Sequence, residues 1–106
     1  MKAFDLYGIP NESMSVARRL IQDAIGVHFE EWDNDHLGLY YRHLGEGREI
    51  MEIYSNVTLS PNGWKEPNFQ DYAVLLYISL TDRHSELRDR ILSKIPSAAL
   101  LDHEML

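Results

Sequence analysis

Apolar residues recur along the chain with two periods, one typical of helices and the other of strands. Apolar positions spaced three and four apart predict a helix that Asn11 or Ser13 caps and that Gly26 ends in a left-handed turn. The same spacing predicts a second helix capped by Thr81 or Asp82. The two apolar stripes are Met14, Ala17, Leu20, Ile21, Ala24 and Ile25, then Leu87, Ile91, Leu92 and Ile95.

Alternating and short apolar runs predict about six strands, at 3–7, 27–32, 38–43, 48–56, 73–80 and 98–101, with residues 102–106 as a tail. We expect a turn at Gly8-Ile9-Pro10-Asn11. Two glycines in Leu44-Gly45-Glu46-Gly47 favour a hairpin between the third and fourth strands. The polar stretch from Thr58 to Tyr72 predicts a long loop, held to the body by Trp64 and Phe69.

The element order is strand, helix, three strands, long loop, strand, helix, strand. It predicts an α+β fold in one domain over residues 1–106, a two-layer sandwich of a mainly antiparallel sheet with both helices on one face. The first topology to expect is a ferredoxin-like variant with an added hairpin. The predicted core is Phe4, Leu6, Leu20, Ile21, Ile25, Val27, Phe29, Val74, Leu76, Ile78, Leu87, Ile91 and Ile95.

Charge and composition narrow the classes of partner. Seventeen acidic residues against ten basic ones give a formal charge of −7, which argues against nucleic acid and favours a basic protein partner. The chain has no cysteine, which excludes thiolate chemistry and is compatible with the cytoplasm. Asp5 stands where the apolar region of a signal peptide would begin, and the apolar run from Ala73 to Ile78 is too short for a membrane span.

Signatures of catalysis are weak, so we expect no enzyme, no cofactor and no metal. The histidines at 28, 36, 43, 84 and 103 lack the close spacing of metal ligands. Asp33-Asn34-Asp35-His36-Leu37-Gly38 begins like a calcium loop, but Leu44 stands where that loop needs a glutamate. Glu30 and Glu31 are expected on opposite faces of a strand, so they cannot flank one glycosidic bond.

One segment combines acids with an aromatic residue. Glu30, Glu31, Trp32, Asp33 and Asp35 are close together in the chain, and we expect Tyr40 and Glu52 on the neighbouring strands. Acids steer a cationic partner and aromatic residues anchor it, so these residues are a candidate interface. The alternative is that Trp32 and one of the two adjacent tyrosines complete the core and the acids only aid solubility. Alternation places one of Tyr40 and Tyr41 outside the core.

Three stretches carry a resemblance to a known family: Leu39-Tyr40-Tyr41-Arg42-His43-Leu44-Gly45-Glu46, Trp64-Lys65-Glu66-Pro67-Asn68-Phe69-Gln70-Asp71-Tyr72 and Val74-Leu75-Leu76-Tyr77-Ile78. In these the chain resembles small bacterial immunity proteins of polymorphic toxin systems, including contact-dependent growth inhibition. The resemblance implies a cytoplasmic inhibitor that binds a cognate toxin domain, often a nuclease.

Other classes stay open beside the immunity protein. A small-ligand regulatory domain would use the glycine-containing turn at Gly8-Ile9-Pro10-Asn11 before the first helix. A small metal- or acid-dependent enzyme would need the histidines or carboxylates to converge. An exposed edge strand would allow a weak homodimer instead of a monomer.

Overall fold

The computed structural model of the protein describes residues 1–35, 38–58 and 63–106. The strands are β1 (Ala3–Ile9), β2 (Glu30–Asn34), β3 (Gly38–Leu44), β4 (Ile50–Ser55), β5 (Val74–Thr81) and β6 (Ala99–Met105). The helices are α1 (Met14–Ile25) and α2 (His84–Lys94), with a short 3-10 helix η1 (Pro67–Phe69).

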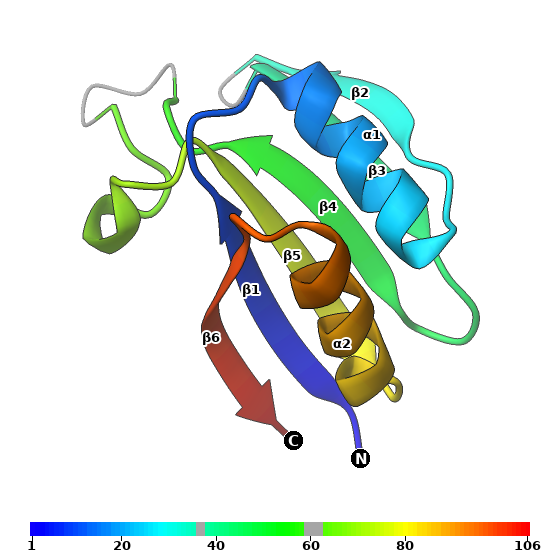
Figure 1. Cartoon of the computed structure of the whole chain (residues 1–106). Coiled ribbons are helices and arrows are strands. Elements are labelled where there is room, and N and C mark those ends of the chain that lie inside the picture. Colours follow the sequence, from blue (N-terminus) through cyan, green and yellow to red (C-terminus); the bar gives the residue numbers. More distant parts are fainter. Residues whose placement is uncertain (36–37, 59–62) are drawn as a thin grey trace.

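All six strands form one antiparallel sheet in the order β2-β3-β4-β5-β1-β6. Both helices cover the same face of this sheet, and the two chain ends lie close together beside β1 and β6 (Figure 1). The predicted α+β two-layer sandwich is therefore confirmed. The ferredoxin-like strand order remains a prediction.

The helix ends differ in how well local sequence determines them. Ser13 caps α1, because its Oγ accepts a hydrogen bond from Val16 N at 3.3 Å, and Gly26 ends it at φ 71°, both as predicted. The predicted cap of the second helix is wrong by one or two residues, because α2 begins after Arg83. Thr81 Oγ1 still accepts a hydrogen bond from Arg83 N, at 3.2 Å. Leu92 is 38% exposed, so its place in the buried stripe was wrongly predicted.

All six strands have limits that differ by one or more residues from those predicted, and three of these differences change the fold around them. β1 continues through Gly8 and Ile9, so the predicted turn there is shorter, and β2 begins only at Glu30. The expected tail at 102–106 is mostly strand, since β6 runs to Met105 and the Leu106 N–H donates to Lys2 O at 2.9 Å. The physical reason is that β1 pairs on both sides, with β5 and β6, and satisfies backbone groups that local sequence leaves open.

The core lies between the helices and the covered face of the sheet. Of the predicted core residues, Phe4, Leu20 and Val27 are only partly buried, and the others are buried. The face of β1 that packs under the helices contains Tyr7 and Ile9, which the prediction missed. The same face carries Asp5, and a charged residue in a strand ordinarily indicates the solvent side. Further core residues that were not predicted are Ala17, Ala24, Tyr41, Met51 and Ile53.

The β3–β4 connection is a hairpin, as predicted. Gly47 takes φ 65°, and Gly45 N donates to Glu49 O at 2.9 Å. A Cβ on Gly45 would lie 2.6 Å from Glu49 Oε1, so this glycine is required by close approach rather than by its φ. Gly8 is similarly crowded, because a Cβ there would lie 2.6 Å from the ring of Tyr72. Gly8 therefore lies in a packed strand and not in an open ligand-binding turn.

Candidate functional site

The face of the sheet opposite the helices carries a continuous group of aromatic and charged side chains. Cross-strand register places directly paired residues on one face and aligns two rows of them. One row is Trp32, Tyr40 and Tyr54, and the other is Glu30, Arg42, Glu52 and Tyr77. Lys65 and Glu66, which precede η1, contact these rows. We call these residues together the open-face cluster.

Three tyrosines form the centre of the open-face cluster. The rings of Tyr40 and Tyr54 stack at 5.0 Å between centroids, and Tyr77 meets Tyr54 edge to face at 5.7 Å. The Tyr54 hydroxyl donates to Glu52 Oε2 at 3.0 Å, and the Tyr77 hydroxyl donates to Glu66 Oε2 at 2.5 Å. Burial, reinforced by these glutamates, raises the pKa of both tyrosines. Both hydroxyls are protonated donors at neutral pH, as ordinary tyrosines are, and the raised pKa extends that state further into the alkaline range.

A lysine from the long loop lies on these rings. Lys65 Nζ is 4.2 Å from the centroid of the Tyr54 ring and 5.1 Å from that of Tyr77. Both distances are within the reach of a cation–π interaction. The open face thus already binds one cation of its own chain.

Asn56 fixes the loop that carries Lys65. Its side chain is fully buried, and its Nδ2 donates to Phe69 O at 2.8 Å and to Tyr72 O at 3.0 Å. Its Oδ1 accepts from Glu66 N at 2.8 Å. Trp64 and Phe69, predicted to hold the loop, are only partly buried. The principal anchor is therefore a buried amide that satisfies three loop backbone groups, and no local pattern marks it.

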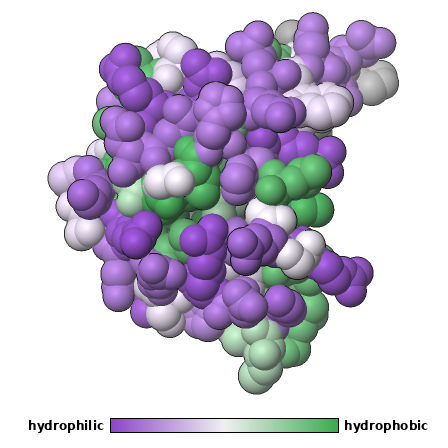
Figure 2. All heavy atoms as spheres, turned by 90° about the vertical axis from the view of Figure 1, so that its right-hand side faces the viewer, coloured by the Kyte–Doolittle hydropathy of each residue, from purple (hydrophilic) through white to green (hydrophobic). Residues whose placement is uncertain are grey.

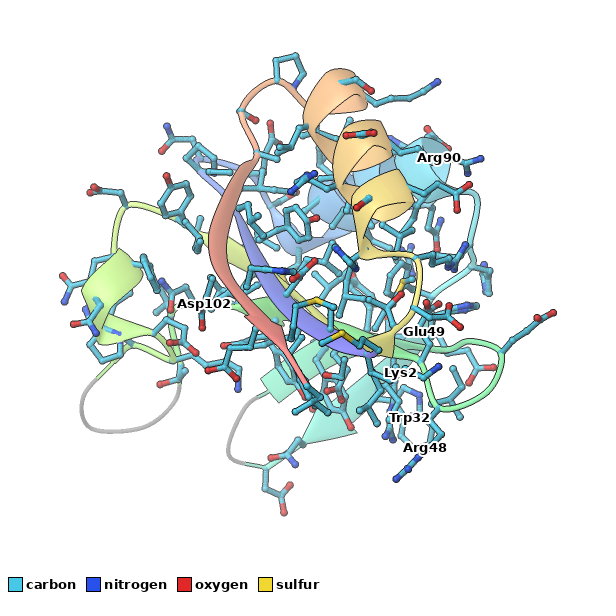
Figure 3. All side chains as sticks on the ribbon, turned by 90° about the horizontal axis from the view of Figure 1, so that it is seen from below. Lys2, Trp32, Arg48, Glu49, Arg90 and Asp102 are labelled. Atoms are coloured by element: carbon cyan, nitrogen blue, oxygen red, sulfur yellow. The ribbon has the colours of Figure 1, made fainter. Side chains whose placement is uncertain are left out.

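Trp32 is the exposed end of the aromatic row. Its side chain is 47% exposed, and in Figure 3 it lies on the side of the sheet away from α2 and Arg90. A cleft of about 270 Å³ opens beside it. This cleft is lined by His28, Glu30, Trp32, Arg42, His43 and Leu44.

Of the two opposite charges that face each other at this cleft, one has an ion-pair partner and the other does not. Arg42 Nε lies 3.7 Å from Glu52 Oε2, so this glutamate partly compensates the arginine. Glu30, directly opposite Arg42 on β2, is exposed and makes no ion pair among the residues that the structure describes. The cleft therefore offers an uncompensated carboxylate beside an exposed indole.

The predicted interface residues divide between the two sides of β2. Glu30, Trp32, Tyr40 and Glu52 come together in the open-face cluster. Glu31 and Asp33 occupy the alternate positions and face the helix side, yet both stay exposed, and Asp35 is exposed in the following turn.

The two adjacent tyrosines separate as alternation requires. Tyr41 is 2% exposed in the core, where the guanidinium of Arg18 lies 4.6 Å from its ring centroid, whereas Tyr40 faces the other side. Trp32 does not complete the core, so that part of the alternative interpretation is wrong.

Sequence reasoning missed several members of the cluster: Arg42, Tyr54, Lys65, Glu66 and Tyr77. Alternation alone places Arg42 on the face of Tyr40, and that signal was available. Tyr77 joins the face only through the pairing of β4 with β5, and Lys65 and Glu66 only through the loop anchor at Asn56.

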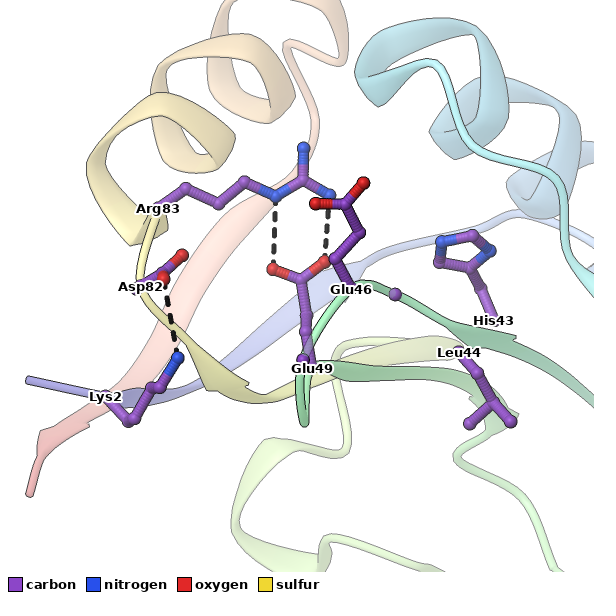
Figure 4. A pocket seen from close by; sticks show the side chains of 9 residues that line it. Lys2, His43, Leu44, Glu46, Glu49, Asp82 and Arg83 are labelled. Atoms are coloured by element: carbon purple, nitrogen blue, oxygen red, sulfur yellow. Dashed lines mark hydrogen bonds and ion pairs between the residues drawn. The ribbon is translucent and has the colours of Figure 1, made fainter.

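A second hollow, of about 690 Å³, lies at the hairpin end of the sheet (Figure 4). Its floor is a tight ion pair in which Arg83 donates through Nη2 to Glu49 Oε1 at 2.8 Å and through Nε to Oε2 at 3.1 Å. Thr81 Oγ1 also donates to Glu49 Oε2, at 2.6 Å. Burial disfavours the charged glutamate, but these hydrogen bonds outweigh it and hold the pKa of Glu49 below its ordinary value.

Most of the other charged side chains that line this hollow are also engaged in ion pairs. Lys2 Nζ lies 3.4 Å from Asp82 Oδ2, and the pKa of Arg83 is raised by its bonds to Glu49. Among the described lining residues, Glu46 alone carries a charge without an ion pair. The ion pair at the base of the hollow thus links the hairpin to the start of α2.

The histidines do not form a metal centre in the part of the chain that the structure describes. His103 Nδ1 bonds to the buried Asp5 carboxylate, and its ring lies 5.1 Å from that of His84. His43 Nδ1 lies 2.9 Å from His28 O. Within residues 1–35, 38–58 and 63–106, no group of three or more His, Cys, Asp or Glu side chains is arranged to hold a metal ion. His36 lies outside the described residues.

Two further observations bear on the class of protein. None of the described helices is long and apolar enough to cross a membrane. Comparison with known proteins finds no matching family model, no matching curated protein and no matching solved structure.

Proposed function

We propose that this protein is an immunity-type inhibitor that binds a basic toxin domain through strand β2 and the open-face cluster. The observation that carries the proposal is a half-exposed tryptophan on an edge strand, set among exposed acids that make no ion pair with the residues that the structure describes. Exposed tryptophans flanked by polar groups are typical anchors of protein interfaces. A cognate toxin and a cytoplasmic location are what the family resemblance implies.

Electrostatics favours a cationic partner for this surface. Glu30, Glu31, Asp33 and Asp35 place carboxylates on both sides of β2, and all four are exposed. The whole chain carries a formal charge of −7. Figure 2 shows mainly hydrophilic residues, with separated hydrophobic patches, on the side of the molecule that is on the right in Figure 1. Such a surface recognises a partner by charge and a few anchors rather than by a broad apolar patch.

Binding alone is sufficient for this function, because an inhibitor needs no reacting group. Tyr54 and Tyr77 are held as protonated donors, and their glutamates accept from them. This arrangement stabilises a fixed surface shape. It is pre-organised for contact, which reduces the entropy lost on association.

The decisive experiment uses the gene that precedes this one in its genome. The encoded large protein, or its C-terminal domain, is co-expressed with the tagged chain and tested for co-purification and for growth of the host. We expect a stable complex and protection of growth. A toxic neighbour that neither binds this chain nor is neutralised by it would refute the proposal.

Charge reversal on β2 tests the proposed surface. Asp33→Lys/Asp35→Lys should slow toxin association about tenfold at low ionic strength, because long-range attraction becomes repulsion. The difference from the parent protein should shrink as salt rises. The measurement is the association rate in a salt series.

The matched control reverses the same charge on the opposite edge strand. Asp102→Lys/Glu104→Lys changes two exposed acids of β6, far from β2 in the strand order. We expect a smaller effect on association, with unchanged thermal unfolding in both double variants. Equal slowing by the two variants would show that net charge, and not the β2 surface, steers the toxin.

A further inference from the structure

The open face contains an internal example of how it binds a cation. Lys65 Nζ lies over Tyr54 and near Tyr77, and both tyrosine hydroxyls are bonded to carboxylates. An aromatic face is attractive to a cation because its π electrons present negative charge, and neighbouring carboxylates add to that attraction. The combination of ring and carboxylate therefore holds a positive side chain in the folded molecule.

An aromatic ring with a neighbouring carboxylate recurs two strands away, on β2, and no positive side chain of the described residues lies on it. Trp32 lies in the cross-strand row of Tyr40 and Tyr54, and Glu30 stands two residues before it on the same face of β2. In the described chain no cation lies over the Trp32 ring, whereas Tyr41 and Tyr54 each have one. Tryptophan is the strongest cation–π acceptor of the aromatic residues.

The groups around the cleft leave room for one more positive charge. Arg42 is the cation that lines the cleft, and Glu52 partly compensates it from β4, on the side away from β2. Glu30 remains for an incoming group. His28 and His43 also line the cleft, and His43 already bonds to the backbone of residue 28 through Nδ1. The nearby acids Glu31, Asp33 and Asp35 add negative potential around the entrance.

We infer that the cleft beside Trp32 receives a cationic side chain of the protein partner, with arginine preferred over lysine. A guanidinium plane stacks on the indole while its N–H groups reach the Glu30 carboxylate, whereas an ammonium group satisfies only one of these contacts well. This inference rests on the proposed function and specifies which chemical group of the partner occupies which place.

The test uses three short blocked peptides that are identical except for a central arginine, lysine or citrulline. Citrulline keeps the shape of arginine and removes its charge. Each peptide is titrated into the isotopically labelled full chain, and the indole N–H signals of Trp32 and Trp64 are followed by nuclear magnetic resonance. We expect a saturable shift of the Trp32 signal with arginine, binding about 2- to 5-fold weaker with lysine, and none with citrulline. The Trp64 signal should stay in place.

Two matched variants locate the carboxylate. Glu30→Gln should weaken arginine-peptide binding, whereas Glu31→Gln makes the same charge change on the opposite side of β2 and should have little effect. Trp32→Leu should abolish the remaining peptide-induced shifts near Arg42 while the rest of the spectrum stays that of the folded protein. The inference is overturned if arginine and citrulline peptides give equal shifts, if no shift occurs at Trp32, or if the shifts centre on the acids of β6.

Failure of this inference is distinguishable from failure of the proposed function. If the toxin binds and Trp32→Leu leaves its affinity unchanged, the inhibitor function stands and the arginine site is wrong. If the arginine peptide binds at Trp32 but the neighbouring toxin does not bind the chain, the cation site stands and the toxin-inhibitor function is wrong.

Discussion

The helix-covered and open faces of the sheet share the same strands but stabilise their side chains in different ways. On the covered face, Ile53, Leu76 and Ile78 pack in an apolar core with the helices. On the open face, Tyr40 and Tyr54 stack and Lys65 lies over the ring of Tyr54. Apolar packing requires exclusion of water, whereas stacked rings, hydrogen bonds and cation–π contacts tolerate partial exposure. The open face is therefore ordered and, at the same time, available to a partner.

Among the described residues, two acids are buried under the helices, and both are paired. Asp5 is 5% exposed and bonds to His103, and Glu49 is 6% exposed and bonds to Arg83 and Thr81. A buried carboxylate without such partners would strongly destabilise the fold. On the open face, Glu30 makes no ion pair within the described part of the chain, and its exposure leaves the carboxylate accessible to solvent.

The largest expected effect contrasts a covered leucine with an uncovered one. Leu76→Ala should lower the free energy of unfolding by about 2–5 kcal/mol, because it opens a cavity under the helices. Leu39→Ala, at a β3 position 41% exposed, should change it by less than about 0.5 kcal/mol. Chemical denaturation of both variants is the measurement. Similar losses of unfolding free energy in the two variants would show that Leu39 is packed as tightly on the helix side of the sheet as Leu76.

A smaller, more local effect is expected from the loop anchor. Asn56→Ala leaves buried backbone groups without partners and should cost about 1–3 kcal/mol. It should also speed amide exchange around Glu66 and Tyr72, which Asn56 holds, while the covered core keeps its protection. Asn68→Ala, an exposed amide in η1, is the control and should be nearly neutral. Unchanged exchange in Asn56→Ala would mean that other contacts hold the loop.

The smallest expected effect concerns Glu49, the buried acid at the hairpin. Since the pKa of Glu49 is lowered in the folded state, its ion pair contributes stability above the ordinary value of 4.5. That contribution is lost as pH falls from 4.5 through the lower folded pKa. Glu49→Gln should therefore be less stable than the parent protein at pH 6, with a difference that narrows in acid.

Glu46→Gln provides the control for this pH series. Glu46 is exposed in the same turn and makes no ion pair among the described residues. Its substitution should leave the pH dependence of unfolding unchanged. A constant gap between Glu49→Gln and the parent protein at every pH would show that packing, not charge, is what Glu49 contributes.

The candidate site was predictable in part. Local alternation correctly required one of Tyr40 and Tyr41 to lie outside the core, but it left open which one, and whether Trp32 is exposed. It did not reveal that Tyr77 would lie two strands from Tyr40, or that a lysine from the loop would cover Tyr54. Those facts depend on register and on the Asn56 anchor, which join positions far apart in the chain.

Composition and neighbouring residues were enough to predict the α+β class, the α1 caps at Ser13 and Gly26, the hairpin and the acidic charge, because each depends on overall composition or on residues only a few positions apart. Pairing between distant segments was needed to establish that Asp5 is buried, that residues 102–105 extend β6, and that Arg83 bonds to Glu49 across 34 positions. Such contacts form only when distant strands and helices pair or pack against one another. Their energy comes from groups that no local window of sequence contains.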